Sequence, residues 1–378
     1  MVAPNGGQKL NSDLPNQKVS ATESKLDFVH ELLPNRVLFG AGCLADLGSE
    51  LDKLELSRGL IVCTEGRIGQ AESLRKIVGK RAIDILPKAK MHVPVETADL
   101  GVKTAQKINA DCTIAIGGGS TVGLAKAIAL KLGLPIIAVP TTFSGSEMTP
   151  IWGITEEGIK KTGRNAVVMP KLAIYDPDLI SDLPISVAGP SGMNAIAHCI
   201  EALYSANPSP IVSLMALEGI HALSCSLPDL AIDKNARELA LYGCWLSGIC
   251  LGSVGMALHH KLCHVLGGAF ALPHAELHTV LIPHVTAYNR PSVPAVLKKI
   301  SIALNAKDGA KGLYDLARTI GAPRSLFELG MQKNQLEEAV MLAIRDPYYN
   351  PRPVAEEHIR TILTDAFEGR EPRQYQIS

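Results

Sequence analysis

The sequence has few aromatic residues and no excess of charge of either sign. Phe, Trp and Tyr make up 4% of its 378 residues, and Lys plus Arg balance Asp plus Glu to a formal net charge of zero. A surface that stacks on nucleic-acid bases needs aromatic side chains, and nucleic acids and anionic membranes attract basic proteins. We therefore expect neither a nucleic acid nor a membrane as a partner.

The chain also lacks closely paired cysteines and long hydrophobic runs. Its eight cysteines are scattered, and several, such as Cys63 and Cys112, lie in apolar stretches. We expect them to be reduced, buried side chains of a cytoplasmic protein. No apolar run reaches the length of a transmembrane helix, and no secretory signal is visible at the N-terminus. With 47% apolar and 20% charged residues, the composition is typical of a soluble enzyme.

The length of the chain favours two domains. Residues 1–27 are polar, and we interpret them as a mobile tail. In residues 28–185, short apolar strands alternate with helices, which predicts an α/β dinucleotide-binding domain with a parallel sheet and helices on both faces. Residues 186–378 carry long helical patterns, which predict an all-helical catalytic domain. The strands are expected at 36–42, 59–63, 82–86, 112–116, 135–139 and 172–175.

A glycine-rich turn follows one of the buried strands. Gly118, Gly119 and Ser120 stand between that strand and a predicted helix. Glycines let backbone N–H groups approach a pyrophosphate, and the helix N-terminus, which Ser120 can cap, adds its dipole. A plain tight turn is the alternative. Thr141 and Thr142 end the next strand, and because carboxyl ends of parallel strands share one edge, both segments indicate one dinucleotide site.

Charged residues near these turns leave two interpretations open. Glu65, which follows the strand at 59–63, either binds a ribose hydroxyl or faces solvent, so the sequence does not choose between NADH and NADPH. Lys160, Lys161 and Arg164 lie in a segment that we predict to be a hairpin or a long loop. They either bind an anionic substrate or form a solvated hairpin tip.

Histidines are concentrated in one stretch. Residues 255–278 hold five of the eleven histidines. His260 and His264 are four residues apart, as are His274 and His278, and residues at this spacing share one face of a helix. Single histidines on apolar helices are usually core residues, but so many in one stretch favour a shared metal-binding or proton-transfer site.

Two further features complete this pattern. Asn194 and His198 form a polar pair at the same spacing on an earlier predicted helix. The first histidine helix should end at Gly267–Gly268, because glycine is the preferred residue after a helix C-terminus. Two or three helices would then present imidazole-bearing faces to one pocket.

Together these segments resemble the group III, iron-containing alcohol dehydrogenase-like family over residues 30–370, and within it most of all the maleylacetate reductases. The resemblance implies a dehydroquinate synthase-like fold and a homodimer. It rests on RVLFGAG at 36–42, HVPVETA at 92–98, IGGGSTVGLAKAIAL at 116–130, PTTFSGSEMTPIWGITE at 140–156, SGMNAIAHCIEALY at 191–204, GMALHHKLCHVLGG at 255–268 and LPHAE at 272–276.

The resemblance also implies roles for site residues. The residues that would bind the cofactor are Gly118, Gly119 and Ser120 at the pyrophosphate, and Thr141 and Thr142 beside them. Metal-using relatives have one Asp and three His as ligands, which match Asn194, His198, His260 and His274 here. His264 would lie near the nicotinamide.

Asn194 is the main departure from the metal-using pattern. An amide oxygen is a weaker donor to a divalent cation than a carboxylate, although three imidazoles alone can still hold Zn²⁺ or Fe²⁺. The maleylacetate reductases that this chain resembles carry Asn at the same position. The resemblance implies that such enzymes need no metal. We therefore predict a metal-independent site, in which the histidines polarise the substrate and donate the proton.

The predicted reaction is the reduction, by NADH or NADPH, of the double bond of an unsaturated 4-oxo dicarboxylate, maleylacetate, to 3-oxoadipate in aromatic compound catabolism. His198, His260 and His274 would hold the enolate charge, and His264 would supply a proton. The residues predicted to bind the anionic substrate are Lys161, Arg164, His278 and Phe143.

Two alternatives use the same scaffold. One is a metal-dependent alcohol dehydrogenase, and the other is a non-redox lyase, cyclase or isomerase. Phe143, Ala271 and Leu277 stand where the family pattern has polar residues. Their apolar character suits a bulkier or more apolar substrate.

Overall fold

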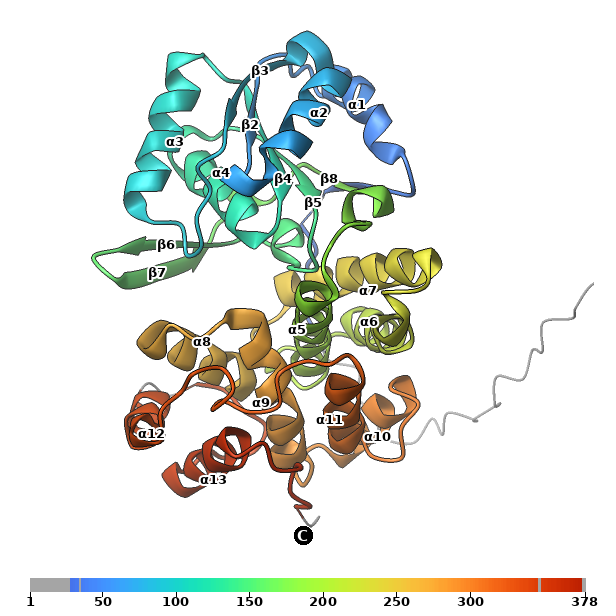
Figure 1. Ribbon diagram of the computed structural model, residues 1–378, viewed down its shortest axis with the longest axis vertical. Helices are drawn as coiled ribbons and strands as arrows, with labels where there is room; N and C mark the ends of the chain where they lie inside the picture. The colour runs from blue at the N-terminus through green and yellow to red at the C-terminus, as the bar shows by residue number, and fades with distance from the viewer. Residues whose placement is uncertain (1–27, 34, 346–347, 376–378) are drawn as a thin grey trace, which may run out of the picture.

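The computed structural model describes residues 28–33, 35–345 and 348–375, so the tail predicted at 1–27 lies outside the described residues. The chain folds into a sheet-containing domain and a domain made of helices, as the sequence predicts (Figure 1). The first helix of the second domain begins at Ile185, close to the predicted boundary.

A six-stranded parallel sheet forms the centre of the first domain, in the order β1-β8-β5-β4-β2-β3. All the predicted strands are present, with ends that differ by three residues at most. They are β1 (Arg36–Phe39), β2 (Gly59–Val62), β3 (Ala82–Leu86), β4 (Cys112–Gly117), β5 (Ile136–Pro140) and β8 (Leu172–Tyr175).

Helices cover both faces of this sheet because successive side chains of a strand point to opposite faces. Ile61 of β2 packs with α1 and α2, whereas Leu60 and Val62 pack with α3 and α4. Strands buried on both faces are continuously apolar, which explains why their sequences were easy to recognise. The four helices are α1 (Leu47–Lys53), α2 (Ile68–Val78), α3 (Val95–Lys107) and α4 (Gly119–Leu132).

The segment predicted to be a hairpin or a long loop is an antiparallel hairpin of β6 (Ile151–Glu156) and β7 (Ile159–Arg164). The backbone N–H of Thr155 donates to the carbonyl of Val93 and so ties the hairpin to the segment before α3. Figure 1 shows the hairpin leaving the sheet at the level where the two domains meet, above α8.

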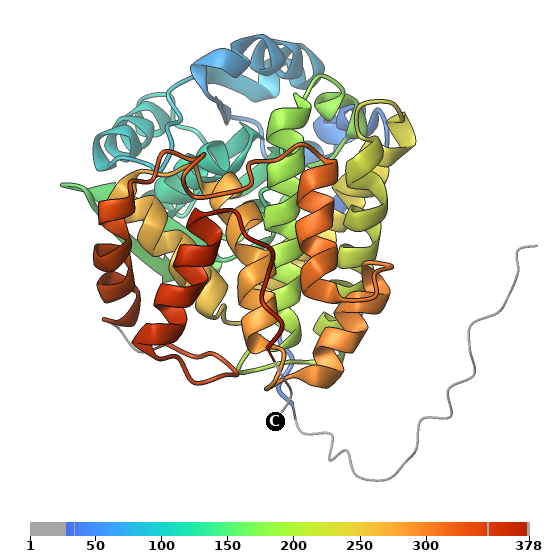
Figure 2. The ribbon, with the colours of Figure 1, turned by 60° about the horizontal axis from the view of Figure 1, so that its bottom comes forward.

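The second domain contains nine helices among the described residues. Helix α5 runs through the interior and contacts α6, α7 and α9, and Figure 2 shows α5, α9 and α11 lying side by side. The helices are α5 (Ile185–Leu203), α6 (Pro210–Ser226), α7 (Lys234–Ser253), α8 (Leu258–Phe270), α9 (His274–Asn289), α10 (Pro294–Ala303), α11 (Gly309–Thr319), α12 (Leu336–Ile344) and α13 (Glu356–Phe367).

Three sequence predictions need correction. Helix α8 does not end at Gly267–Gly268 but continues to Phe270, because Ala271 adopts the left-handed conformation that stops it, with φ of 53°. The eight cysteines are free, but Cys225 is exposed rather than buried. The stretch Pro210–Asp229 is apolar and long enough for a membrane span, yet one face of α6 packs against α5 and α7 as part of the helical domain.

Candidate active site

The glycine-rich turn and the two threonines lie at one edge of the sheet, as predicted. Strands β4 and β5 pair in parallel, with Gly117 opposite Pro140, and the N–H of Thr141 donates to the carbonyl of Gly117 at 3.0 Å. Helix α4 begins directly at Gly119. Its positive N-terminal end therefore lies at the carboxyl ends of two adjacent strands, where parallel sheets bind their ligands.

This turn can be built only from glycine at two positions. A Cβ on Gly117, which has a φ of 150°, would lie 2.4 Å from Thr121 Oγ1, and a Cβ on Gly118 would lie 2.7 Å from Thr142 Oγ1. Gly118 is the N-cap residue, and Ser120, which we expected to cap the helix, lies within its first turn. No side chain caps α4, so its first N–H groups can bind a pyrophosphate.

Six imidazoles from three helices form a continuous group, which we call the histidine cluster: His198, His259, His260, His264, His274 and His278. The ring of His278 lies 4.5 Å from that of His274 and 4.8 Å from that of His260. The ring of His198 lies 5.1 Å from that of His260. The structure therefore brings both predicted pairs and His198 together.

The cluster runs from the protein surface into the core. His264 is exposed and His274 is half-buried, whereas His278 and His259 have no exposed surface. Burial, together with the neighbouring imidazoles, lowers the pKa of His278 and His198 well below its usual value and that of His274 to about 4. These rings are therefore neutral at pH 7, and a neutral imidazole offers one N–H donor and one acceptor.

Glu201 organises the deep end of the cluster, and the sequence analysis missed it. Its buried carboxylate accepts the side-chain Nδ1–H of His260 at 2.7 Å and the backbone N–H groups of Ala257 and His259 at 2.8 Å. It thereby takes the place of a cap for α8, whose own N-cap residue has no polar side chain. Glu201 lies three residues after His198 on α5, and this spacing was the signal available in the sequence.

Of the two neighbouring hairpin lysines, Lys160 rather than the predicted Lys161 is the one whose charge acts on the cluster. Adjacent residues of a strand point to opposite sides, and Lys161 forms an ion pair with Glu156 on the hairpin. The positive charge of Lys160 lowers the pKa of His264 and of His274, after the larger effect of burial and neighbouring imidazoles. The ring of His264 is exposed, so water screens the effect of this charge on its pKa.

Arg164, also predicted to bind substrate, is directed elsewhere. Its guanidinium donates to the carbonyl of Gly252 on α7, and it lines a cavity of about 470 Å³ together with Met148 and Trp245. None of the six imidazoles lines that cavity. The structure therefore separates Arg164 from the cluster.

The apolar departures from the family pattern have structural explanations. Phe143 is 1% exposed and packs in the same hydrophobic cluster as Met148 and Tyr175. Leu277 of α9 has no exposed surface and lies in the hydrophobic cluster that includes Leu262 and Leu266 of α8. Ala271 ends α8. The burial of Phe143 gives no support to its predicted contact with substrate.

The residues that match metal ligands offer suitable atoms but no anionic ligand. Asn194 Oδ1, His198 Nδ1 and His260 Nε2 are buried without a hydrogen-bond partner among the described residues. Nitrogen and oxygen donors of this kind suit Zn²⁺ or Fe²⁺, and a carboxylate behind a ligating imidazole, as Glu201 lies behind His260, is common in metal sites. None of the candidate ligands, however, is a carboxylate, so the fit to a divalent cation is incomplete.

Comparison with known proteins is consistent with this geometry. The model of "Iron-containing alcohol dehydrogenase" matches residues 34–177, and that of "Fe-containing alcohol dehydrogenase family, C-terminal" matches residues 189–367. The chain belongs to the iron-containing alcohol dehydrogenase family. It is an oxidoreductase of this family, whose members are NAD(P)-dependent dehydrogenase-like enzymes.

Individual relatives match nearly the whole chain. It is 51% identical to a maleylacetate reductase of Sphingobium indicum, over 92% of this chain and 99% of that protein, and 49% identical to one of Burkholderia cepacia, over 91% and 99%. The crystal structure of maleylacetate reductase from Rhizobium sp. strain MTP-10005 superposes with a TM-score of 0.89 at 44% identity, covering 92% of this chain and all of that one.

Proposed function

We propose that this iron-containing alcohol dehydrogenase family member reduces maleylacetate to 3-oxoadipate with NADH or NADPH and needs no metal ion. The observation that carries the proposal is a cluster of neutral imidazoles in which Asn194 replaces the one anionic metal ligand. The names of the relatives supply the substrate. The same relatives support a place in aromatic compound catabolism, and we expect a cytoplasmic homodimer.

The reaction makes specific demands on the site. A bound NADH or NADPH would supply a hydride to the double-bond carbon that is β to the ketone of maleylacetate. The electron pair of the double bond then moves onto the ketone oxygen as an enolate, and a proton must reach the carbon between them. The site therefore has to stabilise a developing oxyanion, deliver one proton and bind two carboxylates.

The histidine cluster can meet the first two demands. Neutral N–H donors held in a buried region stabilise developing negative charge strongly, because little solvent competes with them. We assign this role to His198 and His274, because Glu201 holds the Nδ1–H of His260 and leaves the Nε2 of that ring as an acceptor. We assign proton delivery to His264, since its exposed ring can take a proton from water on one nitrogen while releasing one from the other.

Cations near the cluster address the third demand. The charge of Lys160 acts on both His264 and His274, whereas that of Lys261 acts on His264, so we assign Lys160 to a substrate carboxylate in place of Lys161. Gly118, Gly119 and Ser120 would hold the cofactor pyrophosphate at the N-terminus of α4, with Thr141 and Thr142 beside it.

The test is an anaerobic assay of NADH and NADPH absorbance with maleylacetate and metal-stripped protein. Rapid oxidation of either cofactor without metal is the expected result, and the faster one gives the preference. Oxidation only after Zn²⁺ or Fe²⁺ is added would overturn the metal-independence. No oxidation under any condition, with cofactor binding still seen by fluorescence, would overturn the substrate assignment.

A further inference from the structure

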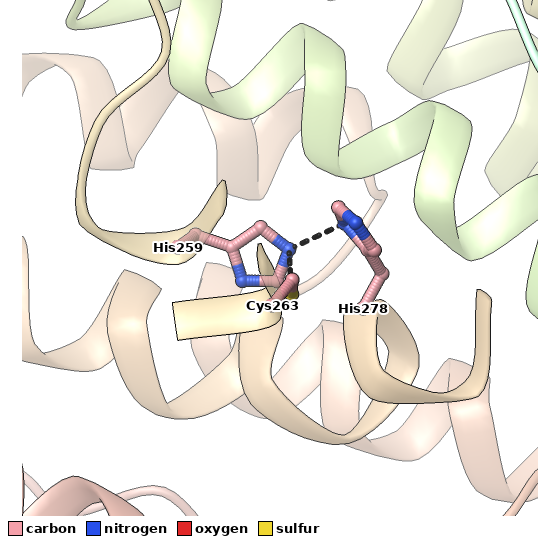
Figure 3. A group of neighbouring side chains, drawn as sticks. All are labelled: His259, Cys263 and His278. Atoms are coloured by element: carbon pink, nitrogen blue, oxygen red, sulfur yellow. Dashed lines mark hydrogen bonds between the residues drawn. The ribbon is translucent and has the colours of Figure 1, made fainter. Parts of the chain in front are cut away.

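His259 is, with His278, one of the two imidazoles of the cluster that have no role in the reaction proposed above. Figure 3 shows it with Cys263, one turn later on α8, and His278 of α9. His259 Nε2 lies 2.9 Å from His278 Nδ1 and 3.7 Å from Cys263 Sγ. The rings of His259 and His278 have no exposed surface, so solvent does not compete with the contact between them.

The hydrogen in the contact between His259 and His278 can be on Nε2 of His259 or on Nδ1 of His278, and the partners of the other two ring nitrogens bear on the choice. If His278 donated, the Nδ1 of His259 would carry the other hydrogen as a buried donor, and that atom has no partner among the described residues. An unpaired buried N–H is costly unless a ligand satisfies it, and each of the two arrangements leaves one such donor. If His259 donates instead, the unpaired hydrogen is on Nε2 of His278.

The Nε2 of His278 is on the edge of the ring opposite the His259 contact. It has no partner among the described residues, and the ring centroids of His260 and His274 lie 4.8 Å and 4.5 Å from that of His278. A hydrogen on this atom is therefore on the ring that contacts His274, which is assigned to the substrate. An N–H group that would stay unpaired on His259 can, on His278, donate to the substrate.

Hydrogen-bond accounting gives His260 the other tautomer, with its hydrogen on Nδ1. Its Nδ1 lies 2.7 Å from the Glu201 carboxylate, which can only accept, so Nδ1 carries the hydrogen and Nε2 presents a lone pair. The core thus holds one imidazole as an acceptor and its neighbour as a donor. A neutral imidazole donor of this kind can polarise a carbonyl group.

We propose that His259 is a positioning residue that holds His278 in its Nε2–H tautomer, so that His278 donates a hydrogen bond to the ketone oxygen of the substrate. The role of His278 rests on the proposed function, whereas the tautomer is a property of the free protein. His259 acts through His278 and touches no reacting atom.

A metal ion bound by His259, Cys263 and His278 is the competing explanation, since their ligand atoms lie within 4.8 Å of one another. The 2.9 Å contact between two nitrogens is a normal hydrogen-bond length, and it explains their approach without an ion. Metal content therefore belongs in the test.

The first measurement is long-range proton–nitrogen NMR on protein labelled with ¹⁵N-histidine, which distinguishes ring nitrogens with and without hydrogen. The His278 signals are assigned by their loss in His278→Gln. We expect hydrogen on Nε2 in the unmodified protein and a mixture of tautomers in His259→Leu. Hydrogen on Nδ1 of His278 in the unmodified protein would overturn the proposal, whether or not maleylacetate is the substrate.

Kinetics supply the second measurement. His278→Leu should lower kcat with maleylacetate about 100-fold, as the loss of one oxyanion donor does, and His259→Leu about 10-fold, both without a change in NADH affinity. His259→Gln should recover most of the loss, because its amide N–H can replace that of the imidazole. Equal activity of the Leu and Gln variants would contradict a positioning role. So would one equivalent of metal that Cys263→Ser releases.

Discussion

The substitution Glu201→Gln tests how the active-site histidines are held. The carboxylate receives the His260 Nδ1–H and the N–H groups of Ala257 and His259, so both of its oxygens act only as acceptors. An amide offers one oxygen and one NH₂ group. In either orientation of the amide, the NH₂ group will face at least one buried N–H from which it cannot accept a hydrogen bond.

The cost can be worked out contact by contact. The amide oxygen can keep Ala257 and His260, which share Oε2, while the NH₂ group faces the N–H of His259. Losing that charge-assisted bond and leaving a buried donor unpaired costs about 2–3 kcal/mol. Removing negative charge from the N-terminus of α8 adds about 1 kcal/mol. We expect the free energy of unfolding to fall by about 3–4 kcal/mol.

Urea unfolding followed by circular dichroism measures this loss, and Glu147→Gln is the matched control. Glu147 is equally buried, but its side-chain partners are the hydroxyl groups of Tyr175 and Ser144, which can accept from an amide as well as donate. Its own backbone N–H and the charge of Lys126 act on it as well. The control should cost no more than about 1 kcal/mol. Equal losses in the two variants would refute the assignment of Glu201 as an acceptor of several N–H groups.

The other predictions concern substrate, cofactor and pH. Lys160→Met should raise the KM for maleylacetate at least about 10-fold and Lys161→Met should not, since an interaction with a charged group contributes about 1.5–3 kcal/mol; equal effects in steady-state assays would reverse the assignment. Gly118→Ala should weaken NADH binding in fluorescence titrations, because its Cβ would meet Thr142, whereas Gly69→Ala, where a Cβ meets nothing within 4 Å, should not. Burial holds the pKa of His284 at about 4. The unfolded chain takes up this proton below about pH 6.5, so stability falls with pH down to 4, by about 2 kcal/mol at pH 5. His284→Leu should lose less stability than the parent on going from pH 7 to pH 5 in urea unfolding, and an equal loss in the two proteins would contradict this source of the pH dependence.

The sheet and the cofactor turn could be predicted because their signals are local. Strands β4 and β5 are buried throughout and are therefore almost continuous apolar runs, and Gly118 and Thr141 each lie directly after one of them. The two segments lie side by side because consecutive parallel strands pair with their carboxyl ends at one edge. The end of α8 was missed because Ala271, rather than a glycine, adopts the left-handed conformation.

The candidate site could be predicted only in part because its contacts join distant segments. Spacing on single helices brought out Asn194, His198 and the two histidine pairs, since i, i+4 neighbours share a face. No spacing rule links Glu201 on α5 with His260 on α8, or His259 on α8 with His278 on α9. The choice between Lys160 and Lys161 depends on which side of β7 faces α8, and the sequence of a solvated hairpin does not specify that.

Asn194→Asp tests whether the loss of a carboxylate is what separates this site from a metal centre. The amide oxygen of Asn194 is buried without a partner, on the same face of α5 as His198, which lies close to His260. A carboxylate there would be buried without a nearby cation, so the metal-free variant should be less stable by about 1–3 kcal/mol. Zn²⁺ or Fe²⁺ would supply the missing charge and bind through one anionic and three imidazole ligands.

We therefore expect the variant to retain about one equivalent of metal after dialysis and to gain thermal stability when Zn²⁺ is added, whereas the parent protein does neither. Asn194→Leu is the control, because it removes the amide without adding charge and should not bind metal more tightly. Elemental analysis and thermal unfolding with and without Zn²⁺ measure these effects. Retention of metal by the parent protein itself would show that three neutral imidazoles and the Glu201 carboxylate behind His260 already suffice, and that the amide is no barrier to a metal-dependent reaction.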